Sequence, residues 1–191
     1  MSVKSPWVVV SVASIVLFST FNALAADDPD LISLGIGQYD QDLIDLDFLF
    51  LNGTNGAEDR ALDYRLEYRF GKSLIGWTEP YAKIKPFIGF EGTSEGAAYG
   101  LAGILADIPI GPLVLTPSFG AGLYSQGNGR DLGSLVEFRS MLELGYRFEN
   151  DIRVSVGYSH ISNANLTELN PGVDIIEAYL HFPVGMLTGN R

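Results

Sequence analysis

The chain contains no cysteine. An exported protein without disulfides must be held together by a hydrophobic core or by a closed sheet. Basic residues are also scarce, since 12 Lys and Arg stand against 23 Asp and Glu, for a formal net charge of −11. Proteins that bind nucleic acid present the opposite charge to the phosphates, so we expect no nucleic-acid partner.

Long apolar runs are scarce as well. The N-terminal region has a cation at Lys4, an apolar run over residues 7–18 and an Ala-Leu-Ala sequence after it, which is the pattern of a secretory signal peptide. No later segment is apolar over 18 residues, which excludes membrane-spanning helices. We predict a signal peptide over 1–25 and one mature domain over 26–191.

The mature chain is rich in strict alternation of apolar and charged residues. In the segment 61–70 the apolar residues are Leu62, Tyr64, Leu66, Tyr68 and Phe70, and the charged ones are Asp63, Arg65, Glu67 and Arg69. The segment 136–148 repeats this pattern. A period of two is typical of strands, and in a small membrane barrel the apolar face meets lipid while the charged face fills the lumen.

Eight segments have this character, and each spans at least nine residues. They are Leu31–Tyr39, Ala61–Phe70, Pro80–Gly92, Gly96–Ala106, Leu113–Tyr124, Leu135–Phe148, Ile152–His160 and Asp174–Phe182. Strands that cross a membrane need about 9–11 residues, whereas strands of soluble domains have about 5–6. The sequence therefore predicts an all-β, eight-stranded antiparallel transmembrane β-barrel in the cell outer membrane.

Connection lengths suggest which end of the barrel faces the cell. Two of the predicted connections are short and comprise residues 108–112 and 149–151. Two others are long: residues 40–60, which contain two Asn-Gly turns, and residues 161–173. Outer-membrane barrels have short periplasmic turns and longer external loops. The seventh strand then runs outward, and its end at His160 lies near the outer leaflet.

Most charged and aromatic residues are interpreted structurally. The charged lumen residues are expected to pair with one another: Arg65, Glu67, Arg139, Glu143 and Arg147. Aromatic residues expected to anchor the barrel at the membrane interfaces are Tyr64, Tyr68, Trp77 and Tyr146. His181 is expected in the lumen.

One short segment has the composition of a reactive site. His160 and Ser162 are two residues apart, so in a strand they share one face, and a histidine can accept the proton of an otherwise weak serine nucleophile. Parity places both on the apolar, lipid-facing side. Asp174 has the same parity on the next strand and lies near the same end, so the three residues predict a Ser-His-Asp triad.

Other interpretations of these residues remain open at this point. A His-x-Ser pair also occurs by chance in polar clusters at loop edges. Glu168 and Glu177 are alternative acids, although the parity of the eighth strand directs Glu177 into the lumen.

The C-terminal motifs resemble a known family. The segment 160–164 reads His-Ile-Ser-Asn-Ala, and it is followed by Asn-Pro-Gly at 170–172 and by Asp174. Together with the strand pattern of 62–70, these motifs resemble the lipid A 3-O-deacylase (PagL) or acyloxyacyl hydrolase-like outer-membrane family. That family often has Glu at the acid position, whereas this chain has Asp.

The resemblance implies an esterase that removes the acyl chain at position 3 of lipid A in lipopolysaccharide. It makes Ser162 the nucleophile, His160 the general base and Asp174 the orienting acid, and Asn163 would help to stabilise the oxyanion. No cofactor or metal is expected. The alternative is a non-enzymatic small barrel for adhesion or membrane integrity, and a homodimer is left open. A phospholipase of the larger barrel type would need about a dozen strands, which the count of eight disfavours.

Overall fold

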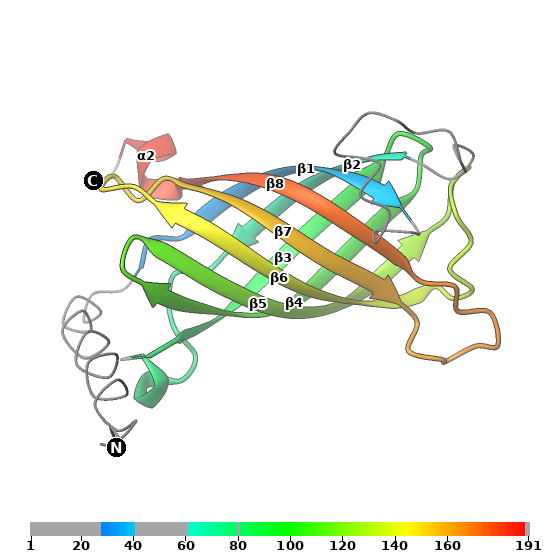
Figure 1. Cartoon of the computed structure of the whole chain (residues 1–191), viewed down its shortest axis with the longest axis horizontal. Helices are drawn as coiled ribbons and strands as arrows, with labels where there is room; N and C mark the ends of the chain where they lie inside the picture. The colour runs from blue at the N-terminus through cyan, green and yellow to red at the C-terminus, as the bar shows by residue number, and fades with distance from the viewer. Residues whose placement is uncertain (1–27, 41–60, 80, 190–191) are drawn as a thin grey trace, which may run out of the picture.

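The computed structural model describes residues 28–40, 61–79 and 81–189. Eight antiparallel strands form one closed barrel, in which consecutive strands pair and the last pairs with the first (Figure 1). The strands are β1 (Leu31–Asp40), β2 (Ala61–Arg69), β3 (Lys83–Thr93), β4 (Ala98–Ile110), β5 (Leu113–Ser125), β6 (Val136–Arg147), β7 (Arg153–Ser162) and β8 (Val173–Pro183). This confirms the predicted fold. The predicted signal peptide and the Asn-Gly turns lie outside the described residues.

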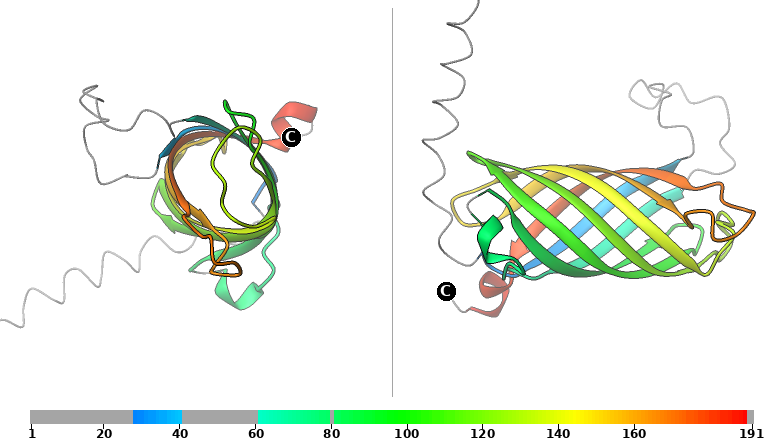
Figure 2. Two further views of the ribbon diagram at one scale, coloured as in Figure 1. Left: turned by 90° about the vertical axis from the view of Figure 1, so that its right-hand side faces the viewer. Right: turned by 90° about the horizontal axis from the view of Figure 1, so that it is seen from below.

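Two short helices lie at the end of the barrel where β1 begins and β8 ends, which we call the inner end. They are the 3-10 helix η5 (Gly76–Thr78) and the α-helix α2 (Val184–Thr188). Figure 2 shows the barrel as a closed ring with both helices outside its wall. Among the described residues, no helix is long and apolar enough to cross a membrane.

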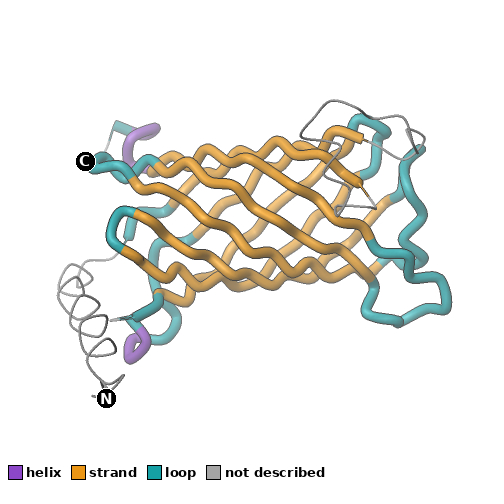
Figure 3. The backbone as a smooth tube through the Cα atoms, in the orientation of Figure 1, coloured by secondary structure: helices purple, strands orange, loops and turns teal. Residues whose placement is uncertain are grey.

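Two expectations about the chain's connections need correction. The third strand begins at Lys83 instead of Pro80, because η5 and the backbone hydrogen bond from Tyr81 N to Thr78 O fold that part of the chain into a turn. The alternation of connection lengths is also incomplete. At the opposite, outer end, β3 and β4 are joined by a tight turn over 94–97, whereas the β2–β3 connection at the inner end is longer (Figure 3).

Charged side chains fill the lumen as predicted. Arg65, Glu67, Arg139 and Glu143 are buried. Arg139 bonds Glu67 and Arg69 bonds Glu143, at 2.5 and 2.8 Å. Opposite charges packed against one another in this way satisfy groups that would be costly to bury alone.

Arg147 does not join this lumen cluster, contrary to the prediction. It is the last residue of β6, and its side chain lies at the inner rim with one third of its surface exposed. There it pairs with Asp151 at 2.6 Å and with Asp28 at 3.3 Å. Asp28 also pairs with Lys83 at 3.0 Å and with Lys85 at 2.5 Å. Burial raises the pKa of Asp28, but Lys85 and the other cations outweigh that effect, so the pKa lies below its ordinary value.

The outer wall of the barrel carries apolar side chains. On β7, Val154, Val156 and Tyr158 are exposed, whereas Arg153 and Ser155 are buried in the lumen. A water-soluble barrel would have the opposite arrangement, so the wall is suited to a bilayer. Of the predicted interface aromatics, Trp77 lies outside the strands in η5, and Tyr68 donates a hydrogen bond to Asp30.

Candidate active site

The β7–β8 hairpin brings the predicted histidine and acid together. In its antiparallel register His160 lies directly opposite Asp174, and both side chains point to the outer, lipid-facing side of the wall. Directly opposed residues in such a pair have their Cβ atoms about 4.5–5.5 Å apart. The hairpin register therefore holds imidazole and carboxylate within hydrogen-bonding distance.

His160 and Asp174 form a direct hydrogen bond. Nδ1 of the ring and Oδ1 of the carboxylate are 2.7 Å apart. The histidine side chain is 44% exposed and the aspartate 23%. A neutral imidazole that donates from Nδ1 to a carboxylate has an acceptor lone pair at Nε2, and the carboxylate stabilises the ring once it is protonated. The pair can therefore act as a general base toward a group on the outside of the barrel.

Ser162 lies on the same face as His160, at the end of β7. It is opposite Phe138 of β6 and is partly exposed. The described hydrogen bonds do not include one between Ser162 and His160. In enzymes without bound substrate, catalytic hydrogen bonds are often long or poorly aligned. The structure thus places the serine beside the histidine on one face, and it places the histidine in contact with the acid.

Tyr158 is a neighbour of the site that the sequence analysis missed. It precedes His160 by two residues on the same outward face and is opposite Ile176 of β8, so it lies diagonally across from Asp174. Both side chains lie on the outward face, and the described hydrogen bonds do not include one between them. Asp174 therefore has His160 directly opposite it and Tyr158 as a diagonal neighbour. Strand parity could have identified the tyrosine, because i and i+2 share a face.

Gly172 packs against the other edge of the His160 ring. A Cβ atom added at this glycine would lie 2.9 Å from Cε1 of the imidazole and 3.3 Å from Nε2. The residue also has a φ of 65°, a left-handed conformation that L side chains rarely adopt. The site therefore requires glycine at this position both for space and for backbone conformation.

Asn163 is buried in the loop after Ser162. Its side-chain Nδ2 lies 2.9 Å from the carbonyl oxygen of Leu132 and 2.8 Å from that of Leu169, and it also lies 2.8 Å from the hydroxyl oxygen of Thr167. Its backbone N–H donates to the side-chain oxygen of Asn170 at 2.9 Å. In this conformation both donors have acceptors within the protein, and they hold the loop together. The contribution of Asn163 to an oxyanion stays a prediction.

The two other carboxylates proposed as acids lie elsewhere. Glu177 is buried in the lumen, where it accepts a hydrogen bond from Ser159 at 2.7 Å and pairs with Arg65, so its predicted orientation is confirmed. Glu168 is exposed in the β7–β8 loop, and no described contact joins it to His160. Within the described part of the chain, Asp174 is the carboxylate that contacts His160.

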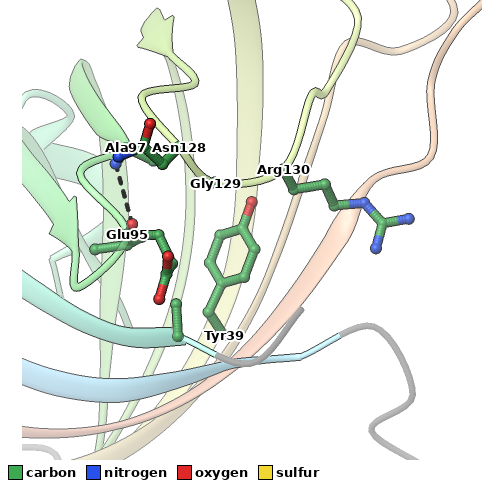
Figure 4. A pocket seen from close by; sticks show the side chains of 8 residues that line it. Tyr39, Glu95, Ala97, Asn128, Gly129 and Arg130 are labelled. Atoms are coloured by element: carbon green, nitrogen blue, oxygen red, sulfur yellow. Dashed lines mark hydrogen bonds between the residues drawn. The ribbon is translucent and has the colours of Figure 1, made fainter. Parts of the chain in front are cut away.

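A cavity of about 80 Å³ at the outer mouth of the barrel is separate from this site. It is lined by residues that include Tyr39, Glu95, Asn128 and Arg130 (Figure 4). Neither His160 nor Ser162 belongs to its lining. In the described ranges no cluster of three or more His, Cys, Asp or Glu side chains could hold a metal ion. His160, Ser162 and Asp174 thus lie apart from this cavity, on the outer face of the barrel.

Comparisons with known proteins show the family and the fold of the chain. The sequence profile of the family described as lipid A 3-O-deacylase (PagL) matches residues 62–183. Lipid A deacylase PagL of Bordetella bronchiseptica strain ATCC BAA-588 / NCTC 13252 / RB50 is 37% identical over 60 residues, which are 30% of this chain and 34% of that protein. The match thus spans about a third of the length of the curated relative.

Two solved structures show the same fold. The crystal structure of the outer membrane enzyme PagL covers 80% of this chain and 99% of its own, with 19% identity and a TM-score of 0.57. Neisserial surface protein A covers 81% and 96%, with 9% identity and a TM-score of 0.50. With the apolar outer wall, these likenesses place the chain among the outer-membrane β-barrels. Since the family profile matches well over half of the sequence, the chain belongs to the lipid A 3-O-deacylase (PagL) family.

Proposed function

We propose that this protein is a lipid A 3-O-deacylase, a serine esterase that hydrolyses the acyl ester at position 3 of lipid A in the outer leaflet. The observation that carries the proposal is the 2.7 Å contact between His160 and Asp174 beside Ser162, on the lipid-facing wall. Polar groups that face lipid are costly and usually functional. A site in this position suits a substrate whose ester bond lies in the membrane.

The reaction proposed for these residues has two steps. Ser162 Oγ attacks the ester carbonyl carbon while Nε2 of His160 accepts the hydroxyl proton, and Asp174 stabilises the resulting imidazolium. The tetrahedral intermediate collapses, the C–O bond to the sugar breaks, and His160 returns the proton to the leaving sugar oxygen. Water then attacks the acyl-serine while the same histidine accepts its proton. The bond between the acyl carbon and Ser162 Oγ breaks, His160 returns the proton to Oγ, and the fatty acid is released.

Oxyanion stabilisation is assigned in this proposal to the segment that follows Ser162, with Asn163 as the expected donor. Backbone and amide donors of this kind stabilise the negative charge of the tetrahedral intermediate. The N–H of Asn163 is one residue from the nucleophile and donates to Asn170 in the described conformation. An oxyanion would have to compete with that side-chain acceptor.

The direct test is mass spectrometry of lipid A from cells that express the chain. We expect loss of the acyl chain at position 3 with the unchanged protein and intact lipid A with Ser162→Ala. Heat-modifiable migration on gels verifies that both proteins form barrels. Intact lipid A in cells with a folded, unchanged protein would contradict the proposal and favour a non-enzymatic barrel.

A further inference from the structure

The outer end of the barrel carries exposed leucines in its loops. Leu166 and Leu169, in the β7–β8 loop that follows Ser162, are 61% and 51% exposed. Leu135, in the adjacent β5–β6 loop, is 64% exposed. We call these three residues the loop patch. Single exposed leucines are common, but a group on adjoining loops indicates a surface that is covered by something apolar.

The two loops that carry the patch are joined to each other. Thr167 Oγ1 donates a hydrogen bond to the carbonyl oxygen of Gly133 at 3.1 Å, and the Asn163 side chain bonds the Leu132 carbonyl oxygen. A Cβ atom at Gly133 would lie 1.9 Å from the carbonyl oxygen of Leu169, so the backbones are in close contact there. These contacts between the two loops thus hold the three leucines in fixed positions relative to one another.

Leu132 fixes this pair of loops to the barrel. Its side chain is fully buried and packs in the hydrophobic cluster at the outer end of the lumen, together with Ile161 of β7 and Val173 of β8. An apolar side chain removed from water in this way stabilises the loop position. The height of the loop patch relative to the barrel wall is therefore set by the fold.

The loop patch is continuous with the lipid-facing wall. Leu135 directly precedes Val136, which is opposite Leu123 of β5, and the side chains of both Val136 and Leu123 are exposed on the outer face. The β3–β4 turn at the same end differs, since its exposed residues are Ser94, Glu95 and Gly96, whereas the β7–β8 loop exposes two leucines beside polar residues such as Glu168. Among the described outer connections, the apolar surface therefore extends beyond the strands only beside the β7–β8 hairpin.

We propose that the loop patch inserts among the acyl chains of the outer leaflet, so that this side of the barrel lies deeper in the membrane than the β3–β4 turn. Lipid chains are the occupant that the wall already contacts, and transfer of leucine side chains from water into them is favourable. Ser162 directly precedes the loop and would be held at the depth where acyl chains meet the polar lipid headgroups.

Spin labels can measure this depth, because a chain without cysteine accepts a label at one chosen position. Leu166→Cys and Leu169→Cys are labelled in the full protein, folded into phosphatidylcholine and phosphatidylglycerol vesicles. Leu123→Cys on the wall and Glu95→Cys in the β3–β4 turn are the matched controls. Oxygen concentrates in the bilayer, whereas a nickel chelate stays in water, so their relative effects on the spectra report depth.

We expect both patch labels to be more accessible to oxygen than to the nickel chelate, as at Leu123, and the Glu95 label to show the reverse. Patch labels as accessible to the chelate as the Glu95 label would overturn the proposal. Since the replaced leucines are exposed, folding should be retained, and Leu135→Cys gives an independent third position. The measurement does not use turnover, so it decides the proposal even if the protein hydrolyses no lipid A.

Discussion

The two histidines lie on neighbouring strands, and each contacts a carboxylate and has a serine nearby. His181 is fully buried in the lumen, with Ser33 at 2.7 Å from Nδ1 and with Ser155 and Glu143 at 2.8 and 3.2 Å from Nε2. His160 is half exposed on the outer wall, and its Nδ1 is bonded to Asp174. Its Nε2 has no hydrogen-bond partner among the described residues.

The two groups have similar residue types and differ in whether the histidine is exposed. Both nitrogens of His181 are occupied and no substrate reaches them, so the lumen group holds strands together. His160 combines a ring that Asp174 orients with a second nitrogen that no described hydrogen bond occupies, on a partly exposed side chain, as a general base requires. The predictions below test this distinction, from the largest expected effect to the smallest.

The histidines themselves should give the clearest contrast. We expect His160→Gln to reduce lipid A hydrolysis by about 10⁴-fold or more and to leave the barrel stable, because a member of a catalytic unit is lost. His181→Gln should retain hydrolysis and reduce the free energy of unfolding by about 1–3 kcal/mol, because buried partners lose their hydrogen bonds. Kinetics in mixed micelles and urea unfolding in detergent measure the two effects. The reverse pattern would assign catalysis to the lumen.

The serines provide a second pair on opposite faces of β7. Ser162→Ala should lower hydrolysis about as far as the loss of His160, since the two act as a unit. Ser159→Ala should change it little, because Ser159 is buried in the lumen and bonds Arg65 and Glu177. The same micelle assay compares them. Equal losses in both variants would contradict the assignment by strand face.

Among the carboxylates, we expect substitution of Asp174 to reduce lipid A hydrolysis most. Asp174→Asn should cost activity steeply, because an amide cannot stabilise the imidazolium of His160, whereas Asp174→Glu should retain much of it. Glu177→Gln should leave hydrolysis nearly unchanged and slightly weaken the barrel, since its carboxylate pairs with Arg65 in the lumen. An inactive Glu177→Gln enzyme beside an active Asp174→Asn would show that the acid is assigned wrongly.

Gly172 should have an intermediate effect. In Gly172→Ala the new methyl group must displace the His160 ring, so we expect hydrolysis to fall by about 10- to 100-fold, as for a misplacement of about 1 Å. Gly96→Ala is the matched control, because Gly96 also has a positive φ but no atom lies within 4 Å of an added Cβ. Equal losses in the two variants would show that contact with the His160 ring is not the cause.

The smallest effect is expected at Tyr158. Tyr158→Phe removes a hydroxyl group from the diagonal neighbour of Asp174 and should lower kcat by less than about 10-fold, with KM unchanged, because the aspartate keeps its bond to His160. Tyr146→Phe, which alters another outward tyrosine away from the site, is the control. A change in KM with constant kcat would instead assign Tyr158 to substrate binding.

Much of this architecture follows from the chain's local pattern. A period of two fixes which side chains share a face, so the outward placement of His160, the lumen placement of His181 and Glu177, and the eight strands were all predictable. The contacts of residues at the ends of strands were less predictable. Arg147 has the parity of the lumen residues, but it lies at the rim, where Asp28 and Asp151 are closer partners than the lumen carboxylates.

Only the tertiary structure decided the contacts between segments that lie far apart in the sequence. The bond from His160 to Asp174 depends on the register of β7 with β8, which a one-residue slip would destroy. The approach of Gly172 to the imidazole and the burial of Asn163 against the Leu132 carbonyl depend on how two loops fold onto the barrel. Periodicity determines direction along one strand, whereas distance across strands and between loops is set by packing of the whole barrel.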